Sequence, residues 1–225
     1  MNLRQAKTIL IIFTYIFVMF LLPYVTMYSL SAIFNISNLD SLQVYTNFVS
    51  YLVLILITIA LFGKELMSDL KQLNKPFSFI KGVAVGWLLL WVCSIVSNFV
   101  LITITQSEES SQNQQFIELL MQVHPIFMTV TTVIFAPIVE EVVFRLTIMK
   151  NLVHQPWIGI AISSFIFGMI HVISAGDFIY SLPYIAMGFA LGYTYHKHQN
   201  IWYSIGVHMF QNFFSTVILL LSMSA

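Results

Sequence analysis

Stretches of apolar residues long enough to cross a lipid bilayer recur along almost the whole chain. A helix needs about 20 such residues to cross the roughly 30 Å hydrocarbon core of a membrane. Counting these stretches predicts seven spanning helices, at residues 8–30, 45–63, 82–105, 126–149, 157–174, 180–195 and 203–222. Because every backbone polar group must be satisfied inside the lipid, we expect an all-α fold, a polytopic transmembrane helical bundle of about seven spans.

Composition excludes a soluble globular domain. Hydrophobic residues make up 59% of the 225 positions, charged residues only 8%, and the mean hydropathy is +0.88. Typical soluble chains carry about 25% charged residues. The formal net charge is zero, so no excess of basic residues indicates a nucleic-acid partner. The partner that the composition predicts is the lipid bilayer itself.

The segments between the predicted spans are too short to fold as separate domains. The two longest run from 64 to 81 and from 106 to 118, and the second begins with a polar stretch expected to be a solvated loop. We therefore treat 1–225 as a single membrane domain. Within it, 1–118 forms accessory spans and 119–225 forms the core that carries the polar motifs described below.

The distribution of basic residues predicts the orientation, because lysine and arginine are retained on the cytoplasmic side of a membrane. If the N-terminus is cytoplasmic, no outer loop contains a lysine or an arginine. The basic residues of the inner segments are Arg4, Lys7, Lys64, Lys71, Lys75, Lys81, Lys150 and Lys197. We therefore expect an integral, multi-pass membrane protein with a cytoplasmic N-terminus.

Buried ionisable side chains are confined to the C-terminal half of the chain. Each costs several kcal/mol in lipid unless it faces protein or water and has a partner, so such residues indicate a functional site. They lie in predicted span four (Glu140, Glu141, Arg145), span five (His171) and span seven (His208, followed one turn later by the amide of Asn212).

The spacing of these residues assigns them to common helix faces. Residues four positions apart are neighbours on a helix, which pairs Glu141 with Arg145 and His208 with Asn212. A charge-assisted bond between Glu141 and Arg145 leaves Glu140 without a local counter-charge. A carboxylate in such a site can accept a proton from water, and a nearby histidine can share that task. A histidine and an asparagine amide can donate N–H groups to a tetrahedral oxyanion, so the set contains the parts that peptide hydrolysis requires.

The three motifs Glu-Glu-x-x-x-Arg, Phe-x-x-x-His and His-x-x-x-Asn, in this order, resemble those of the CPBP family. The resemblance covers roughly 137–212. This family includes type II CAAX prenyl proteases and the Abi-like bacteriocin-processing and self-immunity proteins. The resemblance implies an intramembrane endopeptidase. In the roles that it implies, water is activated by Glu140 and His171, the oxyanion is stabilised by His208 and Asn212, and the site is supported by Glu141 and Arg145.

The resemblance also implies a substrate class and a location. The substrate is expected to be a small or membrane-anchored peptide, or a lipidated peptide, cut in a bacterial plasma membrane. Bacteriocin or pheromone processing and self-immunity are the expected roles. The identity of the substrate, its dependence on a prenyl group and the oligomeric state do not follow from the sequence.

A metal-free glutamate mechanism is preferred, and no cofactor is expected. The chain lacks the His-Glu-x-x-His helix that places two zinc ligands one turn apart. The alternative is a zinc site in which Glu140, His171 and His208 supply ligands from three helices and leave one position open for water.

Two functions without proteolysis stay open. A membrane immunity or binding protein would keep the fold without needing Glu140. A proton-coupled or ion-coupled transporter would use the buried carboxylates and histidines as relays, although no inverted repeat is visible.

Further expectations concern the surroundings of the site. Pro137 is expected to free a backbone carbonyl near the carboxylates. The pattern formed by Gly188 and Gly192 is interpreted as helix packing, with a substrate gate as the alternative. The site is expected to open toward the cytoplasmic half of the membrane. Histidines near span ends are expected to have interfacial roles, and they are His124, His154, His196 and His198.

Overall fold

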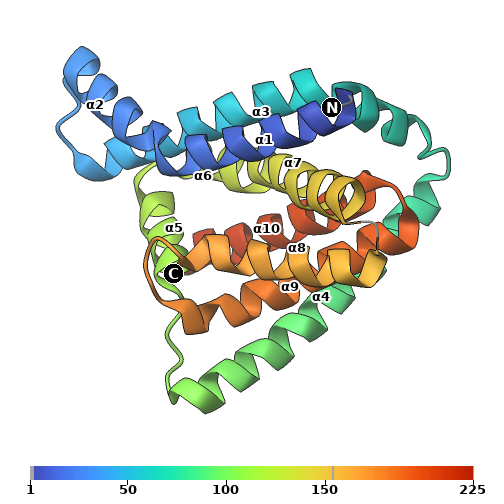
Figure 1. The fold of residues 1–225 in the computed structure, drawn as a ribbon. Helices are drawn as coiled ribbons and strands as arrows, with labels where there is room; N and C mark the ends of the chain where they lie inside the picture. The colour runs from blue at the N-terminus through green and yellow to red at the C-terminus, as the bar shows by residue number, and fades with distance from the viewer. Residues whose placement is uncertain (1–2, 154, 225) are drawn as a thin grey trace.

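The computed structural model describes residues 3–153 and 155–224, and within these residues it contains helices and no strand. His154 lies outside the described residues. Figure 1 shows long helices packed side by side, with the connecting turns gathered at two ends of the bundle. The helices are α1 Leu3–Phe20, α2 Leu22–Phe34, α3 Leu39–Lys71, α4 Pro76–Thr105, α5 Gln112–Val123, α6 Pro125–Thr129, η1 Val130–Phe135, α7 Ala136–Glu141, η2 Val142–Leu152, α8 Pro156–Val172, η3 Phe178–Tyr180, α9 Ser181–His198 and α10 Ile201–Ser224.

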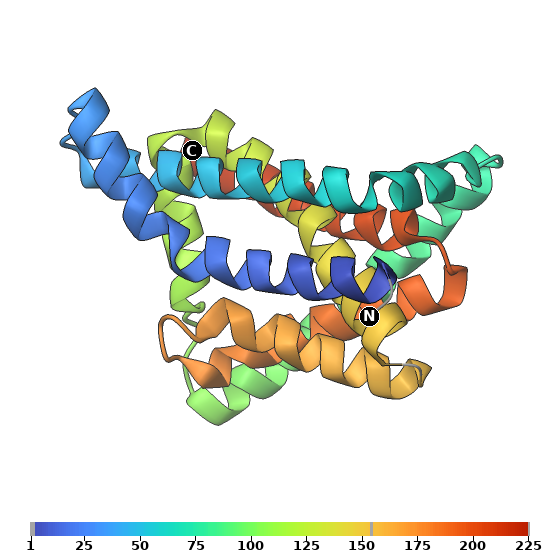
Figure 2. The same cartoon turned by 45° about the horizontal axis from the view of Figure 1, so that its top comes forward.

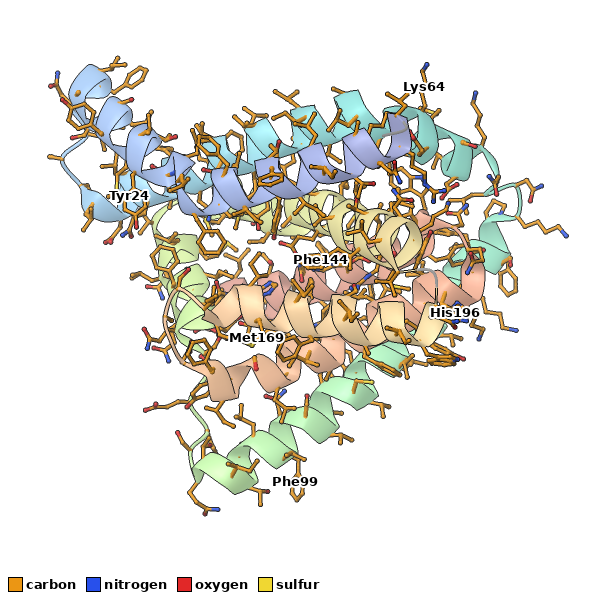
Figure 3. All side chains as sticks on the ribbon, in the orientation of Figure 1. Tyr24, Lys64, Phe99, Phe144, Met169 and His196 are labelled. Atoms are coloured by element: carbon orange, nitrogen blue, oxygen red, sulfur yellow. The ribbon has the colours of Figure 1, made fainter. Side chains whose placement is uncertain are left out.

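The two ends of the bundle differ in charge. The N-terminus and the turns that connect α3 to α4, η2 to α8 and α9 to α10 lie together at the right of Figure 1. Lys64 and His196, which are labelled in Figure 3, lie there too. The eight basic residues of the predicted inner segments all belong to these helix ends and turns, so we call this the basic end. Helix α5 and the C-terminus lie at the opposite end.

Among the described residues, five helices are long and apolar enough to cross a membrane, as in a polytopic helical membrane protein. They are Leu3–Phe20, Leu39–Lys71, Pro76–Thr105, Pro125–Leu152 and Ile201–Met223. The helices at the other two predicted spans also lie in the bundle, but α8 has only 17 residues, and α9 ends in the polar run His-Lys-His. These two helices pack against each other, α9 also packs against α4 and α10, and α8 packs against η2.

Three predicted boundaries are wrong. The expected first span 8–30 is two helices, because Pro23 lacks the N–H that a continuous helix would need, and α2 projects from the bundle without a buried residue. The expected connection 64–81 is helical except for Gln72–Lys75, since the polar ends of α3 and α4 continue beyond the apolar stretches. The C-terminal part of the expected loop 106–118 belongs to α5, whose N-terminus is capped by Ser111.

Close contact between α8 and α9 requires glycine at Gly188, which confirms its interpretation as a packing residue. A Cβ at this position would lie 2.9 Å from the backbone Cα of Ser164 on α8. We expect Gly188→Ala to lower the free energy of unfolding in detergent by about 1–3 kcal/mol, because a backbone must move to admit the methyl group. Gly63→Ala is the matched control, since its Cβ would meet nothing closer than 3.6 Å. Equal thermal stability of the two variants would contradict this packing.

Candidate active site

The residues predicted to form the site come from α7, η2, α8 and α10 and meet in the interior of the bundle. Glu140 is 4% exposed, His208 is 3% exposed, and Glu141 and Arg145 are fully buried. The other two predicted residues are half-buried and line the same cavity as Glu140 and His208. The structure therefore brings all six together from separate helices.

A chain of charged contacts crosses the interior from η2 to α10. Arg145 Nε donates to Glu141 Oε2 at 2.9 Å, and His208 Nδ1 lies 3.2 Å from Glu141 Oε1. Arg145 also donates to Ser163 Oγ on α8, and its guanidinium lies 5.7 Å from the centre of the Phe167 ring. The expected pair between Glu141 and Arg145 is present, and it also holds His208 in place.

The orientation of His208 follows from its contact with Glu141. An ionised carboxylate can only accept a hydrogen bond, so the proton of a neutral His208 is assigned to Nδ1, and Nε2 then carries a lone pair. This Nε2 lies 4.0 Å from Glu140 Oε2. The other oxygen of Glu140, Oε1, accepts a hydrogen bond from Tyr51 Oη of α3 at 2.9 Å. Two proton acceptors thus face each other across a short gap.

Asn212 is positioned by a break in the helix that carries the carboxylates. The π-helical segment η1 forms bonds between residues five apart, such as Ala136 N–H to Thr131 O. The next bond in this series would come from Pro137, which has no N–H. The freed carbonyl of Thr132 accepts instead from Asn212 Nδ2 at 2.8 Å, as expected for a proline at this place. The Asn212 amide carries a second N–H, which this bond leaves unused.

His171 lies in the last turn of α8 and is held from two sides. Its Nδ1 lies 2.6 Å from the carbonyl oxygen of Phe167, and its ring stacks on Tyr184 of α9 with 4.5 Å between centroids. The Phe167 ring contacts both His171 and His208, with centroid distances of 4.7 and 5.9 Å. No hydrogen bond joins His171 to Glu140 among the described residues, so their shared role in activating water stays a prediction.

A cavity of about 410 Å³ is lined by four of these six residues, namely Glu140, His171, His208 and Asn212. Its lining comes from the last turns of α1 and α8, the first turns of α9, the N-terminal half of α3, helix α5 and the middle and later turns of α10. All of these belong to the half of the bundle away from the basic end, as the course of the helices in Figures 1 and 2 shows. The expectation that the site opens toward the basic, cytoplasmic half is therefore not met by the position of the cavity.

The site does not fit the zinc alternative. Among the residues that the structure describes, no three His, Cys, Asp or Glu side chains are placed to hold one metal ion. Glu140 and His208 face each other, but no hydrogen bond or ion pair joins the third proposed ligand, His171, to either of them among the described residues. We derive no catalytic step through a metal.

Sequence reasoning missed the residues that surround the charged cluster. Tyr51 donates to Glu140 although 89 positions separate them, and Tyr15 of α1 is buried in the wall of the same cavity. The available signal was a tyrosine in the middle of an apolar span, because a buried hydroxyl needs a partner. The N-terminal helices thus contribute to the site as well as to the bundle. Two interfacial histidines have aromatic partners, since His124 stacks on Tyr45 and His198 on Tyr203.

Comparison with known proteins gives one family and three relatives. Residues 122–214 match the family described as "Type II CAAX prenyl endopeptidase Rce1-like". The chain is 26% identical over 186 residues to "Putative membrane peptidase YdiL" of Bacillus subtilis, which covers 82% of this chain and 74% of that protein. It is 29% identical over 139 residues to "UPF0177 protein YvdC" of Lactococcus lactis (61% and 52%), and 25% identical over 210 residues to an uncharacterized protein of Mycoplasma capricolum (87% and 62%). The chain thus spans about half to three quarters of the length of these relatives. No solved structure gives a significant match.

Fold and site together define a polytopic helical membrane protein with a carboxylate and histidine cluster buried in an internal cavity. The matches show that residues 122–214 are similar to the Rce1-like family and that most of the chain is similar to a putative membrane peptidase. They also support a membrane protease of the CAAX type.

Proposed function

We propose that the chain is an intramembrane endopeptidase in which Glu140 activates the hydrolytic water. The observation that carries the proposal is the 4.0 Å separation between Glu140 Oε2 and His208 Nε2 at the wall of the cavity. A single water molecule can donate one O–H group to each of these acceptors. Its oxygen lone pairs then face the cavity, where a peptide carbonyl can approach.

The proton movements follow from this geometry. As the water oxygen bonds to the carbonyl carbon, Glu140 takes the proton that the water loses, and it returns the proton to the leaving amine as the C–N bond breaks. Tyr51 holds the other oxygen of Glu140, so the carboxylate keeps Oε2 directed at the water. His208 accepts a hydrogen bond from the second O–H of the water, which keeps this proton, and is itself oriented by Glu141 and Arg145.

This proposal changes the role that the family resemblance implies for His208 and keeps the role that it implies for Asn212. His208 was expected to donate to the oxyanion, but its proton on Nδ1 is engaged with Glu141, so we assign it to the orientation of water. The unused N–H of Asn212 remains the proposed donor to the oxyanion. His171 stays the alternative partner of Glu140, and a greater loss of activity in His171→Ala than in His208→Ala would favour that arrangement.

The proposed substrate is a small peptide or a membrane-anchored peptide segment. The family description names prenyl endopeptidases, so a lipidated peptide is one candidate, and an unmodified bacteriocin or pheromone precursor is the other. The cavity offers polar groups beside apolar walls, which is compatible with either.

The test uses purified protein in lipid nanodiscs with a peptide library in which each sequence is present with and without a prenylated cysteine. We expect specific cleavage products by mass spectrometry, and we expect chelators to leave the cleavage rate unchanged, because no three-ligand metal set is formed among the described residues. Loss of cleavage with a chelator and its recovery with Zn²⁺ would restore the zinc alternative. Absence of any cleavage would favour the membrane binding protein.

A further inference from the structure

The position of the cavity relative to the charges of the chain identifies the side from which it is reached. The lining begins at Glu140 and His208 near mid-bundle and continues along α10 to Leu219, near the end opposite the basic end. On the other helices it includes only residues of the corresponding half, such as Tyr15 near the end of α1 and Tyr184 near the start of α9. None of the basic helix ends contributes to it within the described residues.

The charges of the chain assign the basic end to the cytoplasm. Eight of the nine lysines and arginines lie in the segments at that end, and the ninth, Arg145, is buried in its ion pair. The segments at the other end contain no lysine or arginine and carry the acidic residues Asp40, Glu108, Glu109, Glu118 and Asp177. This asymmetry is the one that fixes the orientation of bacterial membrane proteins.

Helix α5 stands beside the cavity at the end away from the basic residues. Three hydrogen bonds join its start to the α8–α9 region. Ser111 Oγ lies 2.7 Å from Tyr184 Oη, Asn113 Nδ2 donates to the same Tyr184 Oη at 3.3 Å, and Gln112 N–H donates to Asp177 Oδ2 at 2.9 Å. One face of α5 contributes to the cavity lining, including Asn113 and Gln114, while other side chains are exposed. An amphipathic helix in this place is typical of a membrane surface, and here that surface is the one opposite the basic end.

The outer part of the cavity is lined by apolar side chains and by polar groups that carry no charge. Beyond Glu140 and the two histidines, its polar lining consists mainly of amides and hydroxyls, including Gln114, Gln211, Ser215 and Thr216. Such groups pair with the N–H and C=O groups of a peptide backbone. No lysine or arginine lines the cavity in the part of the chain that the structure describes, so an acidic segment would find no counter-charge there.

We infer that the cavity receives its substrate from the extracytoplasmic face of the membrane, as an uncharged peptide segment that passes beside α5. This inference rests on the proposed peptidase function for its substrate. The side of access rests on the cavity and the charges alone. The substrate class is therefore the exposed or exported part of a peptide, such as the outer flank of a membrane-anchored precursor.

The first test determines from which side of the membrane the cavity is reached, and it does so without measuring peptidase activity. Cys93→Ala removes the single cysteine of the chain, and Gln114→Cys or Ser215→Cys then places one thiol at the cavity. We expect a membrane-impermeant charged maleimide to label either variant in intact cells, whereas Lys75→Cys, in the α3–α4 turn, is labelled only after permeabilisation. Labelling of both cavity positions only in permeabilised cells would overturn the inference.

The second test determines on which side of the membrane the substrate segment is cleaved. A peptide that is cleaved in nanodiscs is attached to a single-span anchor on either the outer or the cytoplasmic side, and both reporters are expressed with wild-type or Glu140→Gln protein. We expect cleavage of the outer reporter only, lost with Glu140→Gln. Preferred cleavage of the inner reporter would overturn the inference. If the cavity thiols are labelled from outside but neither reporter is cleaved, the proposed peptidase function and substrate are overturned. The inferred side of access would still be supported.

Discussion

Replacing Glu140 with glutamine is expected to lower the rate of peptide cleavage by about 10²–10⁴-fold, the range that a general base contributes. The side chain keeps its size, and its amide oxygen can still accept the hydrogen bond from Tyr51 Oη. What is lost is the ability to take a proton from the water that we place between Glu140 and His208. The measurement is the initial cleavage rate of a library-derived peptide in nanodiscs, at equal amounts of folded protein.

Glu65→Gln is the matched control for this substitution. Glu65 pairs with Lys7 near the basic end, its side chain is 47% exposed, and it does not line the catalytic cavity. We expect this variant to cleave at the wild-type rate. If Glu140→Gln also cleaved at that rate, the polar cluster would be a scaffold, and the immunity or binding protein would become the better assignment.

Replacing Arg145 with alanine is expected to reduce the free energy of unfolding by about 3–5 kcal/mol, because the substitution leaves a buried carboxylate without its counter-charge. Glu141 and Arg145 are both fully buried, and the guanidinium also donates to Ser163 of α8. The variant thus loses a link between η2 and α8 as well as the ion pair. Thermal unfolding of the purified variants in detergent measures the difference.

The exposed pair between Lys7 and Glu65 provides the comparison for Arg145→Ala. Exposed ion pairs contribute about 0–1 kcal/mol, so Lys7→Ala is expected to leave the unfolding transition nearly unchanged. Arg145→Ala is also expected to slow cleavage, since Glu141 would no longer hold His208 in one orientation. Equal stability of the two variants would mean that Glu141 is neutral in the folded protein and that the buried ion pair does not exist.

Local features of the site followed from the sequence because they depend on neighbours within one helix. The bond between Glu141 and Arg145 spans four positions, and Pro137 frees the carbonyl of Thr132, five positions earlier. Apolar stretches of sufficient length predicted the class of fold and the approximate places of the spans for the same reason.

Features of the site that depend on tertiary structure could not be predicted from the sequence. The hydrogen bond from Tyr51 to Glu140 joins helices far apart in the chain, and no local pattern marks that partner. The helix that carries Glu140 contains two π-helical segments, and no local pattern in the sequence predicts them. The side on which the cavity opens also depends on how the helix ends pack, and this packing places it away from the basic end.

The most direct test of whether Glu140 and His208 act on the same water molecule is a kinetic double-mutant cycle. Cleavage rates of wild type, Glu140→Gln, His208→Ala and the double variant are compared in nanodiscs with one peptide. Residues that act on the same water are strongly non-additive, so we expect the double variant to be about as slow as Glu140→Gln alone. Losses that multiply in the double variant would show independent roles and contradict the water held between the two side chains.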